Sequence, residues 1–459
     1  MNTRPASRSV YRWVGVGVPV TVAVIAGAWA SGIRSPIHQT TLEAHVVASP
    51  SAVAATRAPE PTPSFDAPAD GGTPQPAMDP TGQCALTQRL TPVLGQDRPG
   101  ENFVWSPHSL AVGLSVVAIG ARGRTLQQIL DLMNFRGSAR ELARAQVDSE
   151  ASHVAARSPA NGFAFERAVA IWSEGLLPAF RRDVRAAFPD VALYEAEFRS
   201  ESGRARAVTQ INAWASQKTQ GQLRELLPPN WVPPPGPPVG GWTGSILVNT
   251  LLVRALWHDL TELRSGAFRT ASGKNVRADF VVFSANFPYL LGEHVVGVSL
   301  PLSGTLVRAV FLLPRNASLP LERVPLDGLC ALRSTHPEHV HVEVPRFHVS
   351  FAADLKEPLR RLGLEDLFEP GVAELLIASP QSWIHEVRQR SDIRLDERGI
   401  AAASGTAVQE RLESAPRERL VFDRPFWFSL VGPAGRVLFA GRVTDPSTKQ
   451  ASPSTQTPR

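Results

Sequence analysis

The chain has 459 residues, of which 43% are hydrophobic and 19% charged, and its formal net charge is +5. The basic charge is almost entirely arginine and is dispersed along the chain, which argues against a nucleic-acid-binding face. The length suits one large domain of mixed α and β structure with additional terminal segments.

The N-terminus has the three-part layout of a secretory signal. Residues 1–13 are basic and carry no acid, Val14–Ala28 is almost wholly apolar, and Ala28-Trp29-Ala30 forms a small-x-small cleavage site. The alternative is an uncleaved membrane anchor over residues 14–30, although a helix of that length reaches only about 26 Å across a core of ~30 Å. Both interpretations predict export, to an extracellular or periplasmic location or to a membrane surface.

Residues 31–83 are rich in Pro, Ala, Ser and Thr and lack periodic apolar positions, which predicts a disordered linker. We expect a folded domain over 84–447 and a disordered tail over 448–459. Cys84 and Cys330 are the only cysteines, so one disulfide is allowed in an oxidising compartment. Nothing in the sequence shows that these two residues lie close together, and their pairing stays open.

The folded part opens with a short apolar strand, Asn102–Trp105. Ser106 and Pro107 then provide an N-cap and a first helical residue. Thr125 and Gln128 match a capping box for the next helix. Hydrophobic periodicity predicts the following elements. The strands are 163–172, 191–198, 245–257, 280–283, 294–302, 306–313 and 339–345, and the helices are 177–188 and 204–227.

The remaining segments include a Pro-rich insertion and a terminal hairpin. Residues 228–244 are too rich in proline for a sheet interior, so we expect a stiff surface loop, with partner docking as the alternative. Two apolar runs, Phe426–Val431 and Val437–Ala440, flank Gly432-Pro433-Ala434-Gly435, a pattern typical of a β-hairpin.

The stretch from residue 396 to 422 holds an unusual run of small residues. Residues 400–408 carry neither charge nor proline. As a strand, the run would alternate Ile400, Ala402, Ser404, Thr406 and Val408 on one face with small residues on the other, so it could enter the middle of a sheet. The alternative is an Ala-rich loop or short helix, because alanine favours helices.

Few residues indicate catalytic or metal chemistry. His339, His341 and Glu343 would share one strand face and could ligate zinc, but we favour an exposed strand edge with ordinary polar residues. No Gly-x-Ser-x-Gly elbow surrounds any serine, and no Ser-x-x-Lys pair occurs. We therefore predict no catalytic residue, no metal and no cofactor, and that the chain is not an enzyme.

Several motifs together resemble the serpin family. Glu397-Arg398-Gly399 followed by an Ala-rich run resembles the hinge of a serpin reactive-centre loop. The opening block 102–135 and the C-terminal segments 422–426 and 437–443 also match, and the resemblance spans roughly 86–446. It implies an α+β serpin fold with a large, mostly antiparallel central sheet, smaller sheets, eight to nine helices and an exposed reactive loop. We expect a monomeric, exported member of bacterial type.

The resemblance also implies a function, that of a suicide inhibitor of a serine or cysteine protease. In this family the loop is cleaved as bait, and its hinge inserts into the main sheet before the acyl-enzyme is hydrolysed. The alternatives are a non-inhibitory serpin-fold binding protein and a protease substrate without trapping. The hinge residues carried over onto this chain are Glu397, Gly399, Ile400, Ala401, Ala402, Ala403, Ser404, Gly405 and Thr406.

Two positions depart from the family pattern. Ile400 stands where the family prefers Thr or Ser, and its bulk is expected to slow insertion. Gln389 stands where a His is expected in the region behind the opening sheet, whereas Ser106, Ser109 and Asn249 are retained. Because Gln can donate and accept, we expect an altered opening barrier and an intact fold.

The family spacing locates the scissile bond. Counting forward from Gly399 gives Glu413 before the cut, and counting back from Phe422 gives Ser414, with Leu412 as a near alternative. Leu412 would suit a chymotrypsin- or subtilisin-like protease, and Glu413 a glutamate-specific one. Cleavage at Arg411, Arg417 or Arg419 by trypsin-like enzymes would change the tether length and is expected to produce turnover.

Overall fold

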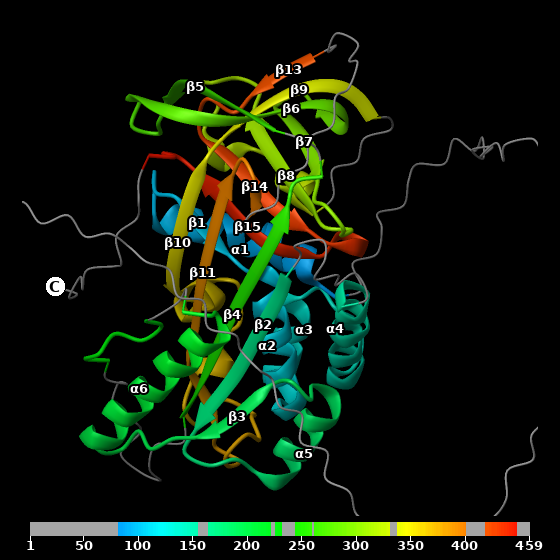
Figure 1. Ribbon diagram of the computed structural model, residues 1–459. Helices are drawn as coiled ribbons and strands as arrows, with labels where there is room; N and C mark the ends of the chain where they lie inside the picture. The colour runs from blue at the N-terminus through cyan, green and yellow to red at the C-terminus, as the bar shows by residue number, and fades with distance from the viewer. Residues whose placement is uncertain are drawn as a thin grey trace, which may run out of the picture. The chain divides into compact units, whose positions relative to one another are not determined.

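Two β-sheets and the helices packed on them form the folded part of the chain (Figure 1). The computed structural model describes residues 81–154, 164–221, 225–231, 244–258, 261–330, 337–400 and 418–447. All of these ranges belong to one compact unit.

The six-stranded sheet carries the region of functional interest. Its strand order is β10-β11-β12-β4-β2-β3, and β11 also pairs directly with β4. The sheet is mixed, because the β11–β4 and β2–β3 pairs are parallel and the others antiparallel. Its strands are β2 (Ala164–Ser173), β3 (Ala192–Glu195), β4 (Gly244–Leu256), β10 (Phe347–Asp354), β11 (Trp383–Asp396) and β12 (Gly399–Ile400).

The nine-stranded sheet follows the order β1-β15-β14-β8-β7-β6-β9-β13, with β5 paired to β6. Its strands are β1 (Phe103–Trp105), β5 (Glu262–Arg269), β6 (Asn275–Leu291), β7 (Val295–Pro301), β8 (Arg308–Pro314), β9 (Pro337–Pro345), β13 (Glu418–Val421), β14 (Phe426–Val431) and β15 (Val437–Val443). Antiparallel pairing of β14 with β15 confirms the predicted terminal hairpin.

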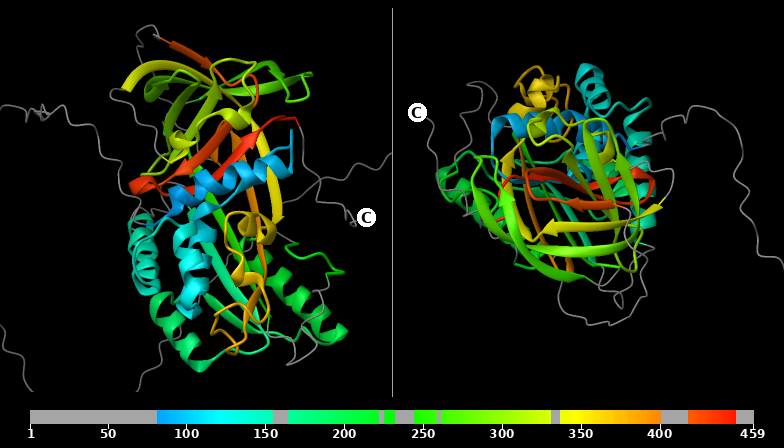
Figure 2. Two further views of the ribbon diagram at one scale, coloured as in Figure 1. Left: turned by 180° about the vertical axis from the view of Figure 1, so that it is seen from behind. Right: turned by 90° about the horizontal axis from the view of Figure 1, so that it is seen from above.

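Seven α-helices occur in the described ranges, and those nearest the N-terminus cover one face of the six-stranded sheet (Figure 2). They are α1 (Gln83–Asp97), α2 (Pro107–Gly120), α3 (Gly123–Leu132), α4 (Ala139–Val154), α5 (Pro178–Ala187), α6 (Glu201–Lys218) and α7 (Lys356–Arg361). Helix α2 is buried on nearly every side, because it contacts both β4 and β2.

Local sequence signals are partly confirmed. Ser106 caps α2, since its side chain accepts a hydrogen bond from Ser109 N. The capping box at Thr125 and Gln128 is wrong, because α3 already begins at Gly123. Thr125 Oγ1 accepts instead from Glu374 N, and Gln128 Oε1 from Asp366 N. Both side chains therefore fasten α3 to a distant loop.

Helix α6 is shorter than the predicted 204–227. It ends at Lys218, and Gln220 and Gly221 then adopt φ values of 53° and 80°. Left-handed backbone of this kind terminates a helix. The apolar residues Val208, Ile211, Trp214 and Ala215, which recur at helical spacing, are buried.

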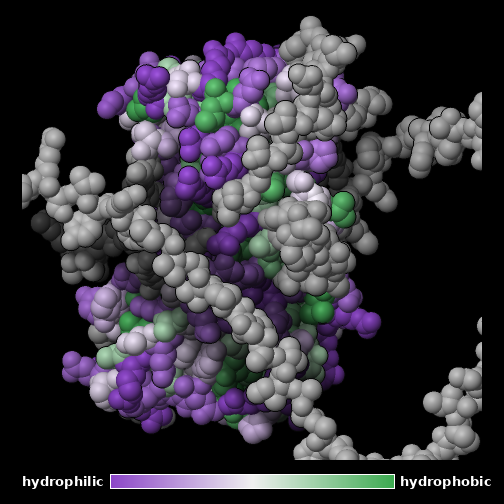
Figure 3. Space-filling model, in the orientation of Figure 1, coloured by the Kyte–Doolittle hydropathy of each residue, from purple (hydrophilic) through white to green (hydrophobic). Residues whose placement is uncertain are grey.

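Cys84 on α1 and Cys330 form a disulfide across 246 residues, with their Cα atoms 5.6 Å apart. The pairing that the sequence left open is therefore present in the structure. Polar residues dominate the described surface on the face seen in Figure 3, and exposed large apolar side chains are scattered. Scattered apolar side chains of this kind are normal on a folded protein and mark no binding surface.

Candidate functional site

The candidate site is the seam between β11 and β4, the neighbouring parallel strands at the centre of the sheet (Figure 1). The two strands pair from Trp383–Gly244 up to Ser391–Leu251. Beyond Leu251 they separate, and β12 enters between them. Ile400 of β12 lies antiparallel to both, opposite Leu395 of β11 and Ala255 of β4. Gly399 and Ile400, the two residues of β12, therefore already occupy a strand position in the sheet.

Gly399 is required where β12 enters. A Cβ atom at this position would lie 2.0 Å from Ala255 O, and its φ of 153° is unfavourable for other residues. Ile400 follows with 1% of its surface exposed, so the sheet already accommodates the bulk of this side chain. Trp257 holds the approach to β12, because its indole nitrogen donates to Asp396 O at 2.8 Å and its backbone nitrogen to Arg398 O.

Glu397 is fixed at the edge of the seam. Its carboxylate lies 3.4 Å from Arg346 Nε, and its carbonyl accepts a hydrogen bond from Thr261 Oγ1. The other hinge residues, Ala401, Ala402, Ala403, Ser404, Gly405 and Thr406, lie outside the described residues, as do Leu412, Glu413 and Ser414.

The four residues predicted for the sheet-opening region lie together and are buried. Gln389 Nε2 donates to Asn249 Oδ1 at 2.6 Å and to Ser106 O at 3.0 Å, and Gln389 Oε1 accepts from Ser106 N at 2.8 Å. Ser106 Oγ donates to Ser109 Oγ at 3.0 Å. Gln389 thus donates and accepts at once, and it ties both seam strands to the N-terminus of α2.

Unsatisfied polar atoms near this cluster were not foreseen from the sequence. Among the described residues of the two seam strands, buried atoms without a hydrogen-bond partner include Asn249 Nδ2, Thr250 Oγ1, Arg390 Nε and Ser391 Oγ. Leaving a buried polar group unpaired costs about 1–3 kcal/mol. The signal is invisible in the sequence, because it depends on which side chains meet across strands far apart in the chain.

The segment 401–417 ends at β13, which pairs in parallel with β9. Arg419 of β13 and Arg264 of β5 both bind the Glu343 carboxylate, and His341 Nε2 lies 3.1 Å from Glu343 Oε1. Burial would raise the pKa of Glu343, but hydrogen bonds from Arg419 and His341 outweigh it and lower that pKa. The charge of Glu343 therefore anchors β13 through Arg419.

No metal centre forms at this strand in the part of the chain that the structure describes. His339 Nε2 lies 3.3 Å from Ser284 Oγ, and the Glu343 carboxylate is shared between arginines. Within the described ranges no group of three or more metal-ligating side chains is arranged to hold an ion.

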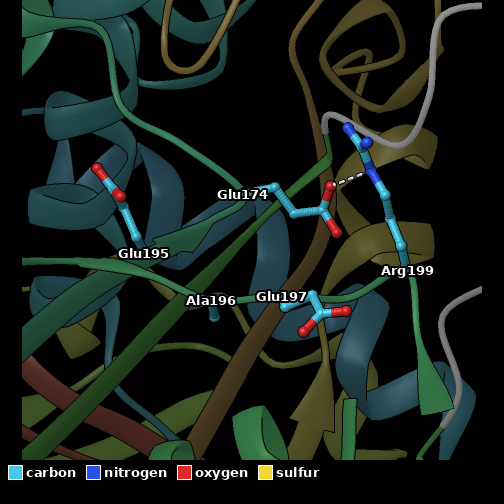
Figure 4. Close-up of a pocket in the computed structure, with 5 residues that line it drawn as sticks. All are labelled: Glu174, Glu195, Ala196, Glu197 and Arg199. Carbon is cyan, nitrogen blue, oxygen red and sulfur yellow. Dashed lines mark hydrogen bonds and ion pairs between the residues drawn. The ribbon is translucent and has the colours of Figure 1, made fainter. Parts of the chain in front are cut away.

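A separate open pocket of about 550 Å³ lies beside the ends of β2 and β3 (Figure 4). It is lined by Glu174, Glu195, Ala196, Glu197 and Arg199. Each carboxylate already pairs with an arginine. Glu174 accepts from Arg199 Nε, Glu195 from Arg181 and Glu197 from Arg206. We assign no ligand to this pocket.

Comparisons with known proteins agree with this geometry. The family model described as Serpin (serine protease inhibitor) matches residues 81–446. A serine protease inhibitor of Cyanea capillata is 27% identical over 365 residues, covering 76% of this chain and 93% of the relative.

Two solved structures share the fold. The native stressed conformation of an Arabidopsis serpin has a TM-score of 0.66 at 23% identity, covering 82% of this chain and 100% of that one. Human thyroxine-binding globulin complexed with its ligand has a TM-score of 0.67 at 17% identity, covering 80% and 98%. At these identities the likeness shows the fold alone.

The relatives named here come from animals and a plant, so they do not support the expected bacterial type. The predicted α+β serpin fold is confirmed. The expectation that the chain is not an enzyme agrees with a family of protease inhibitors. Because the family model covers most of its length, this chain belongs to the serpin (serine protease inhibitor) family.

Proposed function

We propose that this serpin traps a serine protease as a covalent acyl-enzyme, by inserting its cleaved reactive loop between β11 and β4. The observation that carries the proposal is β12, which already lies antiparallel to both strands at the open end of the seam. Continued insertion would exchange one parallel ladder for two antiparallel ladders, and each added residue would bond on both sides.

The register of β12 predicts the register of the inserted loop. Ile400 is opposite Leu395 and Ala255, so each step forward in the loop is one step back in both strands. Six steps on, Thr406 would lie opposite Gln389 and Asn249, which are themselves neighbours across the seam. The pairing of β12 with β11 and its pairing with β4 therefore both place Thr406 beside the Gln389–Asn249 pair.

Insertion would also bring a hydroxyl beside two of the unpaired polar atoms of the seam, Asn249 Nδ2 and Ser391 Oγ. By the same register Ser404 would lie opposite Ser391, and Thr406 opposite Asn249. Directly opposed residues in antiparallel strands point to the same face, so each hydroxyl would arrive beside an unpaired group. Before insertion, these buried groups lack hydrogen-bond partners, which costs stability. The two hydroxyls of the loop are placed to remove that cost.

The charge pattern of the loop fits this path. No charge occurs from Ile400 to Gln409, and the register places Gln409 opposite Glu386 and Ile246. Glu410 is the first charged residue of the loop. The register places it opposite His385, where the pairing of β11 with β4 shifts. We propose that insertion to this depth displaces the tethered protease along the sheet.

We propose Glu413 or Ser414 as the residue before the scissile bond, with Leu412 as the alternative. The corresponding targets are glutamate-specific, chymotrypsin-like or subtilisin-like proteases. Trypsin-like enzymes would cleave at the nearby arginines and would be expected to turn the chain over as a substrate.

Incubation of the full chain with a panel of these proteases tests the proposal. A complex that survives denaturing electrophoresis, with its junction read by mass spectrometry, is the expected result. Cleavage by every protease in the panel with full protease activity remaining would favour the non-inhibitory binding protein, and the proline-rich segment 228–244 would then be examined for a partner.

We further propose that the protein is exported, with residues 1–30 as a signal or anchor and 31–83 as a tether. The Cys84–Cys330 disulfide supports this, because structural disulfides persist in oxidising compartments. Among the described helices, none is long and apolar enough to cross a membrane, and residues 1–30 lie outside the described ranges. N-terminal sequencing of the exported protein would show whether cleavage follows Ala30.

A further inference from the structure

The chain enters the described fold through residues 81–84, which we call the entry anchor. Thr81 and Gln83 are at most 1% exposed. The Thr81 carbonyl accepts a hydrogen bond from Gln146 Nε2 at 2.7 Å, and Gln83 Nε2 donates to Gln146 Oε1 at 2.8 Å. Gln83 Nε2 also lies 3.0 Å from His108 Nδ1. The chain is therefore fixed against α4 and α2 at the very start of α1.

The entry anchor ends in a covalent bond to a distant part of the molecule. Cys84 is bonded to Cys330, which directly follows the short helix η3 (Asp327–Leu329). Helix η3 packs on β8 and β14, and Ser429 Oγ of β14 donates to Leu329 O at 2.7 Å. The disulfide therefore joins the entry anchor to the middle strands of the nine-stranded sheet.

Covalent connectivity decides which elements would carry tension that arrives from the N-terminal linker. Such tension passes from Cys84 straight to Cys330, because the disulfide is a covalent bond. The first described strand beyond Cys330 is β9, which is paired with β6 on one side and with β13 on the other. The elements between the two cysteines, including the seam strand β4 and the α2 cap residue Ser106, lie outside that path.

Without the disulfide, the same tension would reach the seam. It would act first on α1 and then on β1, which among the described strands pairs only with β15. The next residue is Ser106, whose backbone nitrogen and oxygen both bond to the Gln389 side chain. Pulling on Ser106 would therefore load the contact that joins α2 to the seam strand β11.

We propose that the entry anchor and the Cys84–Cys330 bond form a mechanical bypass, which keeps tension on the N-terminal linker away from the β11–β4 seam. The bond spans a sequence separation of 246 residues, so about 850 Å of extended chain is withheld from stretching. Only the purpose of the bypass rests on the proposed tether, whereas the path of the force is a property of the intact fold.

Single-molecule stretching of the full chain, held by its two termini, tests the bypass. The oxidised wild type should release about 850 Å less chain on unfolding than Cys84→Ser does. The variant should also show a first rupture, that of α1, at a lower force than any rupture in the oxidised wild type. Both results are expected because α1 carries tension only when the disulfide is absent.

Gln83→Leu separates the bypass from a general loss of stability. It removes the buried hydrogen bonds of the entry anchor and keeps the disulfide. We expect wild-type rupture forces in Gln83→Leu alone, and a further lowering of the first rupture force when it is combined with Cys84→Ser. Gln127→Leu is the matched control and should change neither background, because its amide bonds Asp131 on the exposed surface of α3 at 2.8 Å.

Equal rupture forces and equal released lengths in the oxidised wild type and Cys84→Ser would overturn the bypass. A Gln83→Leu effect of the same size with and without the disulfide would also overturn it. If Cys84→Ser does not fold, the wild type is held at constant force and a thiol reductant is added. A further step of about 850 Å that requires the reductant supports the bypass, and its absence overturns it. Protease trapping is measured separately, so a chain that stretches as expected but forms no covalent complex would lose only the proposed inhibitory mechanism.

Discussion

Gln389 and Asn249 face each other across the seam, with Gln389 Nε2 2.6 Å from Asn249 Oδ1 and both side chains at most 2% exposed. The same Gln389 amide holds the backbone of Ser106 through both its oxygen and its nitrogen. One side chain thus joins β11, β4 and α2 at the level where we propose that the loop inserts. Opening the seam requires the contact with Asn249 to break.

Replacing Gln389 with Leu should destabilise the intact protein by about 2 kcal/mol, because buried groups on Ser106 and Asn249 would lose their partners. The urea midpoint of the uncleaved chain measures this change. Gln127→Leu is the control, since Gln127 makes only an exposed bond to Asp131 at 2.8 Å. Equal midpoints for the two variants would contradict the role given to Gln389.

Replacing Gly399 with Ala should expel β12 from the seam. The new methyl group would lie 2.0 Å from Ala255 O, closer than any ordinary contact. We expect the yield of covalent protease complex to fall at least several-fold while the loop is still cleaved. Gly363→Ala provides the comparison, because Gly363 has a φ of 94° but open space around its Cβ position. A normal yield in Gly399→Ala would show that β12 does not nucleate insertion.

Replacing Thr406 with Val should lower the stability of the cleaved form and leave the intact form unchanged. Valine has the same shape but lacks the hydroxyl proposed to meet Asn249 Nδ2, so the expected loss is about 1–2 kcal/mol. Thermal unfolding before and after loop cleavage separates the two states. The neighbouring Ala407→Ser adds a hydroxyl on the opposite face and should not compensate. Equal losses in the intact and cleaved forms would refute the register.

Much of the fold follows from local patterns. The apolar run 245–257 predicted β4, which is buried along nearly its whole length. Gln389 and Asn249, by contrast, were paired only through the family resemblance. They lie 140 residues apart in the chain, and no periodicity within either strand shows that the two strands are neighbours.

The errors share one physical cause. Thr125 and Gln128 have the spacing of a capping box, but tertiary neighbours at Glu374 and Asp366 take their hydrogen bonds. The unpaired Ser391 hydroxyl and the Trp231–Glu386 contact were likewise not predicted. Side-chain hydrogen bonding is decided by three-dimensional neighbours, which a local motif does not contain.

Acidification should weaken the fold through buried histidines before it affects the carboxylates. Burial lowers the pKa of His385 from 6.5 to about 4, with Glu386 opposing the shift and Lys356 and Arg388 adding to it. Burial also lowers the pKa of His108. Since the unfolded chain binds these protons more readily, the stability present above pH 6.5 is lost as pH falls toward 4.

His385→Asn tests this contribution, because asparagine has no charge at any of these pH values. The His385 shift corresponds to about 3 kcal/mol of stability lost between pH 6.5 and 4. Urea midpoints at intervals from pH 7 to pH 4 should therefore decline less steeply in the variant. An unchanged slope between pH 6.5 and 4 in His385→Asn would show that His385 is not held neutral by the fold.

Glu150 makes the stability of the fold depend on pH in a second, lower range. Burial alone would raise its pKa, but hydrogen bonds and charge from His108 and Arg167 lower it from 4.5 to about 2. Its contribution is therefore complete above pH 4.5 and is lost only as pH falls toward 2. Glu150→Gln should lower stability at neutral pH and flatten the decline below pH 4.5. A decline below pH 4.5 that is as steep in Glu150→Gln as in the wild type, measured by urea midpoints, would contradict this assignment.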